Sequence, residues 1–325
     1  MHSPDYRPCQ DAAPDHSVNP MNVTPSRDIL LAELTKRQEE TIARCLAAAS
    51  RTSQRLVFSH STALLLLGAE LPARIARAAR EELHICCNRQ EERRELISVI
   101  PHTWSRTMDL RNPYTMLTCV GPCVAWAQLA PEVSLEELTM LADALMRRDA
   151  RLRLAASGDF DALMEHAGKF PSKRKCRLAM RLMRENTDSS RETLTRLLII
   201  RHGLPCPQVN VGVPAGVGGT LHVDMAYPNL KIAIEYQGAQ HDRDLHQARI
   251  DRGRRDFLRT HGWLWLEPDN RIFLDENQAG EFIDNLSDLL SQRLETPIIP
   301  SPLMTLEQTV DARRIHHRRN ARLLL

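Results

Sequence analysis

Hydrophobic and polar residues alternate over two neighbouring stretches in the C-terminal third of the chain. In residues 221–227, large apolar side chains such as Val223 and Met225 alternate with polar ones such as Asp224, which is the two-residue period of a half-buried strand. A Pro-Asn pair with turn chemistry follows, and residues 231–237 then alternate in the same way. The pattern predicts a β-hairpin with one apolar and one polar face.

The segments around this hairpin carry the patterns of further helices and strands. Apolar residues recur at helical spacing in residues 189–201, in residues 244–261 and around Phe282 and Leu290. Short apolar runs predict strands at residues 209–213 and 263–266. The predicted order is therefore helix, three strands, helix, strand, helix, which is an α/β arrangement.

The chain before this region predicts a mixed but mainly helical domain. Helical spacing covers residues 28–49 and 133–156, and short strand patterns lie at residues 83–87 and 97–100. Ser59 or Ser61 is expected to cap a short helix that ends at Gly68. This capping role explains why a serine precedes His60, so the pair does not require a catalytic function. The first residues are rich in proline and show no period, so we expect disorder there. The predicted division is 1–26 disordered, 27–170 N-terminal domain, 171–295 C-terminal domain and 296–325 basic tail.

Composition narrows the class of protein only slightly. With 325 residues and 42% hydrophobic residues, the chain can bury a core in each of two domains. The formal net charge is +2, so affinity for nucleic acid has to come from local clusters of lysine and arginine. One dense cluster contains Lys173, Arg174 and Lys175, and such a run is either a solvated helix face or a phosphate-binding surface.

The cysteines and the hydropathy pattern bear on localisation. The 8 cysteines form no paired CxxC motifs, and no early apolar segment resembles a secretion signal. No apolar run approaches the roughly 20 residues of a membrane span. We therefore expect a cytoplasmic protein without a membrane anchor.

Acidic residues on the polar face of the predicted hairpin are the strongest chemical signal. In the simplest register Asp224 lies beside Glu235, and Gln237 projects from the same face as Glu235. Two neighbouring carboxylates repel each other unless a cation lies between them, and carboxylate oxygens suit Mg²⁺. An ordinary amphipathic hairpin, whose polar face simply meets water, explains the same alternation.

Several motifs occur in an order that resembles the PD-(D/E)xK nuclease superfamily. The motifs DMAYP, AIEYQGAQH, D-x-x-R-R-D-F-L and HGW look like the DUF559 group, which is similar to very-short-patch repair endonucleases, and they span residues 187–267. Upstream, SHSTALLLLG more weakly resembles AbiEi-family antitoxins. The resemblance implies a restriction-endonuclease-like core in the C-terminal half.

The resemblance also implies roles for particular residues. Asp224 and Glu235 would hold Mg²⁺ or Mn²⁺, and Glu192 would complete the acidic site from the preceding helix, although Glu192 also fits a capping box. Gln237 stands where the superfamily usually has lysine, and a neutral amide only hydrogen-bonds. His241 is a candidate for positioning the attacking water.

The arginines after the hairpin complete the candidate set. Arg254 and Arg255 either contact a phosphate backbone or form local ion pairs. The sequence thus predicts a metal-dependent DNA endonuclease. The alternatives are an antitoxin-type regulator that binds DNA without cleaving it and has a toxin as its partner, and a partner-binding module without metal or DNA affinity.

Overall fold

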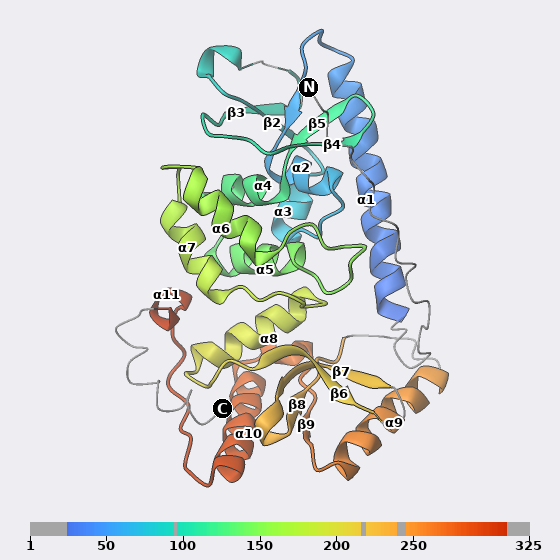
Figure 1. The fold of residues 1–325 in the computed structure, drawn as a ribbon, viewed down its shortest axis with the longest axis vertical. Coiled ribbons are helices and arrows are strands. Elements are labelled where there is room, and N and C mark those ends of the chain that lie inside the picture. The colour runs from blue at the N-terminus through green and yellow to red at the C-terminus, as the bar shows by residue number, and fades with distance from the viewer. Residues whose placement is uncertain (1–24, 94–95, 216–218, 239–244, 311–325) are drawn as a thin grey trace, which may run out of the picture.

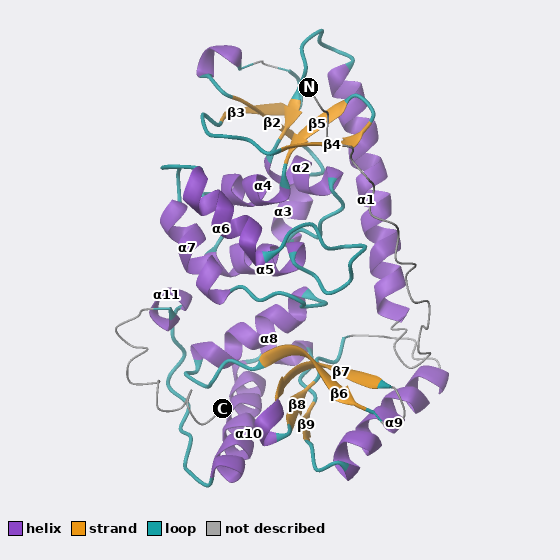
Figure 2. Ribbon diagram, in the orientation of Figure 1, coloured by secondary structure: helices purple, strands orange, loops and turns teal. Residues whose placement is uncertain are grey.

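The computed structural model describes residues 25–93, 96–215, 219–238 and 245–310, with side chains omitted for 25–28 and 245–251. It is an α/β protein with two mixed β-sheets, one in each half of the molecule (Figures 1 and 2). Most of the predicted disordered segment, the end of the basic tail and His241 lie outside the described residues. Among the described helices, none is long and apolar enough to cross a membrane.

The N-terminal sheet has the strand order β3-β2-β1-β5-β4. Its strands are β1 (Val57–Phe58), β2 (Leu83–Cys87), β3 (Val99–Thr103), β4 (Leu110–Tyr114) and β5 (Leu117–Val120). The predicted strand at residues 83–87 is confirmed as β2, and the one predicted at residues 97–100 overlaps the start of β3. Both parallel and antiparallel pairs occur in this sheet.

Helices cover this sheet and form most of the N-terminal half. They are α1 (Pro25–Ala49), α2 (His60–Leu66), α3 (Ala73–Ala78), α4 (Pro122–Leu129), α5 (Leu135–Leu145), α6 (Ser157–His166) and α7 (Lys173–Leu182). In Figure 1 the single long helix α1 runs along one side of this half. Every residue of α4 is buried, so α4 lies at the centre of the core.

The helical pattern predicted for residues 133–156 is interrupted in the structure. α5 begins with a complete capping box between Ser134 and Glu137. It ends at Leu145, and the Asp149 carboxylate then accepts a hydrogen bond from the Arg151 backbone N–H at 3.0 Å. A local side-chain bond of this kind offers the backbone an alternative to helical pairing.

The C-terminal half has its elements in the order that the sequence predicts. They are α8 (Ser190–Arg201), β6 (Gln208–Pro214), β7 (Thr220–Tyr227), β8 (Ile232–Ile234), α9 (Leu245–Thr260), β9 (Leu264–Leu266) and α10 (Glu276–Leu294), and short α11 (Leu306–Thr309) follows. Short 3₁₀ turns lie at Gln90–Glu92, Pro228–Leu230 and Asn270–Phe273. Strands β6, β7 and β8 pair antiparallel, whereas β8 and β9 pair parallel.

Helices cover both faces of the C-terminal sheet. On one face Met225 and Ile234 join a buried cluster with Ile199 of α8 and with α10. On the other face Ala226 and Ala233 join a cluster with α9. The polar face of the hairpin is therefore partly covered by α9, because small alanines allow that helix to approach closely.

Helix α8 belongs to both halves of the molecule. Leu197 and Ile200 pack into the N-terminal core, whereas Ile199 packs against the C-terminal sheet. A buried ion pair between Arg196 and Asp143 of α5 fixes α8, with 2.5 Å between Arg196 Nη2 and Asp143 Oδ2. Helix α7, which the predicted division assigns to the C-terminal domain, likewise contributes buried side chains to the N-terminal core.

Candidate functional site

The two predicted metal-binding carboxylates lie at the end of the β7–β8 hairpin. Met225 pairs with Ile234 in the antiparallel register, so Asp224 and Glu235 are the next opposed positions. Asp224 Oδ2 accepts a hydrogen bond from the Tyr236 backbone N–H at 2.9 Å. The strand predicted at residues 231–237 therefore covers only Ile232–Ile234, because the Tyr236 N–H donates to a carboxylate and not to a backbone carbonyl of β7.

Glu192 approaches the hairpin from the first turn of α8. Its side chain is only 4% exposed. The Glu192 N–H donates to Ser189 Oγ at 3.2 Å, but its carboxylate accepts from the Asp188 N–H at 2.9 Å. Only half of the expected capping box is present, because the Glu192 carboxylate accepts from the N–H of Asp188 and not from that of the N-cap residue Ser189.

The charges around Glu192 show that acidic groups gather here. Burial raises the pKa of the Glu192 carboxyl well above its usual range, and the negative charges of Asp224 and Asp188 raise it further. Like charges have this effect only when they are close in a poorly solvated place. The structure thus brings Glu192, Asp224 and Glu235 to one end of the sheet.

Arg254 of α9 contacts the acidic group directly. One of its nitrogens, Nη2, donates to Glu235 Oε1 and to the His222 carbonyl oxygen, each at 2.7 Å. The Arg254 and Glu235 side chains are 21% and 20% exposed, so water screens this ion pair only in part. The neighbouring Arg255 pairs with Glu267 at 2.9 Å. Both arginines predicted to contact phosphate are thus paired with carboxylates.

Gln237 lies just beyond β8, two residues after Glu235. Its backbone N–H donates to the Pro268 carbonyl at 2.8 Å, and it forms an isolated parallel bridge with Asp269. Gln237 as a whole is half-buried. The structure describes nothing of His241, the other residue predicted to position water.

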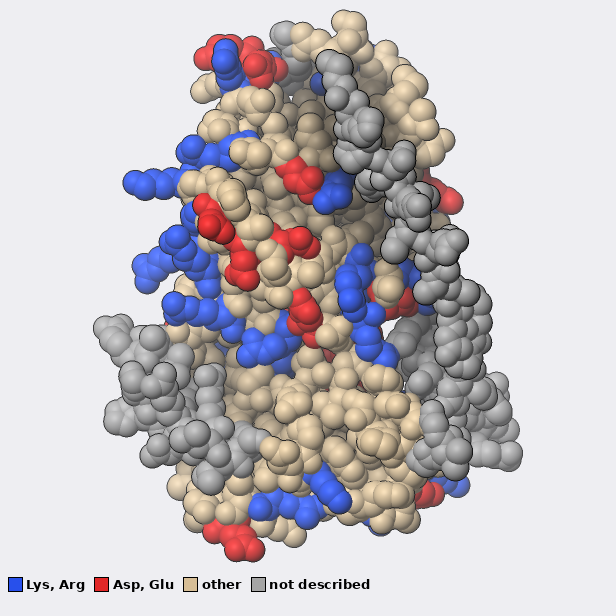
Figure 3. All heavy atoms as spheres, viewed as in Figure 1, with Lys and Arg blue, Asp and Glu red and all other residues tan. Residues whose placement is uncertain are grey.

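The basic cluster on α7 lies away from the carboxylates, in the half that contains the first sheet (Figure 1). Lys173 Nζ donates to the carbonyls of Met164 and Gly168, and Lys175 Nζ donates to those of Ala130 and Val133 at 2.7 Å each. These two lysines therefore satisfy backbone carbonyls of neighbouring segments. Arg174 is exposed, and Figure 3 shows blue side chains along the edge where α6 and α7 lie.

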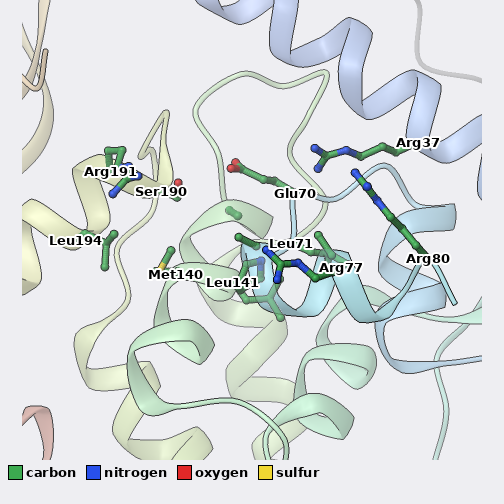
Figure 4. Close-up of a pocket in the computed structure, with 14 residues that line it drawn as sticks. Arg37, Glu70, Leu71, Arg77, Arg80, Met140, Leu141, Ser190, Arg191 and Leu194 are labelled. Atoms are coloured by element: carbon green, nitrogen blue, oxygen red, sulfur yellow. The ribbon is translucent and has the colours of Figure 1, made fainter. Parts of the chain in front are cut away.

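An arginine-lined hollow beside α8 was not predicted from the sequence. It has a volume of about 570 Å³ and lies between α1, α3, α5 and the start of α8 (Figure 4). Its charged lining residues are Arg37, Glu70, Arg77, Arg80 and Arg191. No sequence signal marks this set, because its members come from separated segments.

The hollow borders the acidic group through the first turn of α8. Arg191 lines it and directly precedes Glu192. The Arg191 guanidinium also lies 5.3 Å from the centre of the Phe273 ring, which in turn is 6.0 Å from the Tyr236 ring. The positive charge of Arg191 and the carboxylate of Glu192 thus come from consecutive residues of one helix.

Comparison of the chain with protein-family models, with curated proteins and with solved structures finds no match.

Proposed function

We propose that the C-terminal half is a metal-dependent endonuclease that hydrolyses DNA phosphodiester bonds, with a restriction-endonuclease-like core. The observation that carries this proposal is that Asp224 and Glu235 occupy opposed positions of the hairpin, and that the buried Glu192 of α8 is close enough to Asp224 for their negative charges to interact. Glu192 is buried, whereas Asp224 and Glu235 are partly exposed. Holding a buried carboxylate near other negative charges costs free energy, which a bound cation would offset.

The donor set fits Mg²⁺ or Mn²⁺. Both ions prefer oxygen ligands, and Mg²⁺ commonly uses one or two carboxylates while keeping several waters. Asp224 and Glu235 supply such oxygens from opposed strand positions. When bound, the ion would polarise the phosphate and lower the pKa of a coordinated water.

The chain's own groups have distinct parts in this proposal. The Tyr236 N–H orients Asp224, and the Asp188 N–H orients Glu192. Arg254 neutralises Glu235 in the absence of other cations and is close enough to stabilise negative charge on a phosphate. The Gln237 amide would hydrogen-bond the attacking water without taking its proton.

The arginine-lined hollow supports DNA as the substrate. It is lined by three arginines, Arg77, Arg80 and Arg191. Guanidinium groups form strong paired hydrogen bonds with phosphate oxygens. The hollow would therefore position DNA without reading its sequence.

A second candidate is a DNA-binding regulator of the antitoxin type that does not cleave DNA. Two observations favour it over a nuclease: Arg254 already bonds to the Glu235 carboxylate, and Gln237 stands where a lysine is usual in the superfamily. A protein partner, such as a toxin, belongs to this alternative. The first residues of the AbiEi-like motif lie in the N-terminal half, at the start of α2.

Cleavage of supercoiled plasmid DNA in Mg²⁺ or Mn²⁺ tests the first candidate. Metal-dependent nicking is expected for the wild type and for Asp284→Asn, an exposed acid on α10, but not for Asp224→Asn or Glu235→Gln. Retention of DNA in a gel shift without cleavage would support the regulator. Neither cleavage nor binding would contradict both candidates.

A further inference from the structure

Three histidines gather in the N-terminal half, apart from the acidic group. One ring nitrogen from each of His60, His84 and His102 lies within 4.8 Å of the others. The His60 and His102 ring centres are 3.8 Å apart, and His84 Nδ1 is 2.9 Å from His102 Nε2. We propose that these three side chains form a zinc-binding site.

The sheet itself brings two of the histidines together. β2 and β3 are parallel neighbours, in a register that pairs His84 with Ile100 and Cys86 with His102. Residues two apart on a strand share a face, so His84, Cys86 and His102 all project to the same side. The His84–His102 contact therefore follows from strand pairing and does not depend on a flexible loop.

His60 reaches the same side from the beginning of α2. The backbone N–H of Ser59 donates to the His84 carbonyl at 2.9 Å, which fixes the junction between β1 and α2 against β2. His60 itself has φ of +52°, a left-handed conformation that is unfavourable for histidine. The surrounding structure holds the ring in place in spite of this cost.

The separations of the nitrogens approach those of a tetrahedral ion, but the three rings are stacked with interplanar angles of 21–25°, so they have to rotate on binding until each ring plane contains the ion. With Zn–N bonds of about 2.0–2.1 Å, two nitrogens on a tetrahedral zinc lie about 3.3 Å apart. The His84–His102 separation of 2.9 Å has to widen by only a few tenths of an ångström. Three imidazoles and a water complete four-coordinate zinc, whereas Mg²⁺ prefers oxygen ligands.

The surroundings of the histidines provide a partner that can orient one ring. His60 Nδ1 is 3.0 Å from Ser59 Oγ, so Nδ1–H can donate to the hydroxyl and leave Nε2 free to bind an ion. His60 is buried and His102 is half-buried, so the protein shields the proposed site from bulk water.

Ser59 stands at the N-cap position of α2 but makes no side-chain capping bond. Its hydroxyl instead contacts the His60 ring. The capping role expected for Ser59 is therefore not the one that the structure gives it. In the proposed site Ser59 is a positioning residue that orients His60.

Metal analysis of the purified full chain, with no metal added, tests the proposal first. About one zinc per chain is expected, and after chelation Co²⁺ should rebind with the intense visible absorption of a tetrahedral site. His102→Gln, on a half-buried strand position, should lose the zinc, whereas the exposed His166→Gln should retain it. Ser59→Ala should weaken zinc affinity about 10–100-fold.

Two further results separate this site from the acidic group and from misfolding. Zinc content should be unchanged in the Asp224→Asn, Glu235→Gln double variant, because its acids lie in the other sheet. If His102→Gln fails to fold, the wild type alone decides the question. A wild-type protein that contains no zinc and shows no tetrahedral Co²⁺ spectrum would overturn the proposal.

Discussion

The buried ion pair between Asp143 and Arg196 should be essential for holding α8, the helix that carries Glu192. Both side chains are almost fully buried, at 1% and 0% exposed. Asp143 also accepts from Thr193 Oγ1 at 2.9 Å and from the Arg184 N–H at 2.7 Å. Asp143→Asn keeps the volume of the side chain but leaves the Arg196 guanidinium buried without a counter-charge.

Removing one partner of a buried pair costs about 3–5 kcal/mol. At an unfolding entropy of about 2.1 cal/mol/K per residue, this loss lowers the melting temperature of the 325-residue chain by about 4–7 °C. Calorimetry or thermal circular dichroism measures the shift. The exposed pair between Asp109 and Arg111 is the control, because Asp109→Asn should cost less than about 1 kcal/mol.

A double variant separates the loss of charge pairing from a general disturbance of the core. Asp143→Leu combined with Arg196→Met replaces the pair by apolar side chains, and it should recover much of the stability that Asp143→Asn loses. Equal melting temperatures for Asp143→Asn and Asp109→Asn would refute the reasoning, because they would show that the buried pair does not hold α8.

Three further predictions concern two side chains at the acidic group and one lysine on α7. The pKa of Glu192 in the folded protein lies above its usual value of 4.5, so the ionised form of Glu192 destabilises the fold. Glu192→Gln should therefore have the same melting temperature as the metal-free wild type below that pH, and a higher melting temperature than the wild type at neutral pH. Lys175→Met should lower stability by about 1.5–3 kcal/mol in urea unfolding, whereas the exposed Arg174→Gln should change it by less than about 0.5 kcal/mol. Arg254→Met should strengthen Mn²⁺ binding in calorimetric titration, and unchanged affinity would mean that Arg254 and the ion do not compete for Glu235.

The sequence predicts the elements of the C-terminal half well, because their periodicity is strong and local. The alternation around Val223 and Met225 gives β7 and its partner, and the expected register correctly opposes Asp224 to Glu235. Helix α8 follows from the apolar spacing of residues 189–201. These signals involve residues that are close along the chain.

Features that depend on distant segments could not be predicted in this way. Alternation gives no sign that α9 covers the second face of the sheet, or that Arg254 bonds to Glu235. The arginine-lined hollow collects side chains from four helices and their flanking turns. The histidine cluster likewise depends on the pairing of β2 with β3, and the strand spacing alone does not reveal that His60 joins it.

Direct measurement of Mn²⁺ binding tests the central claim, that Asp224 and Glu235 hold a divalent cation. Electron paramagnetic resonance of free Mn²⁺ during a titration gives the number of bound ions and their affinity. The account predicts about one bound ion per wild-type chain, lost in Asp224→Asn and in Glu235→Gln but retained in Asp284→Asn. Absence of binding by the wild type, or equal binding by all four proteins, would contradict it.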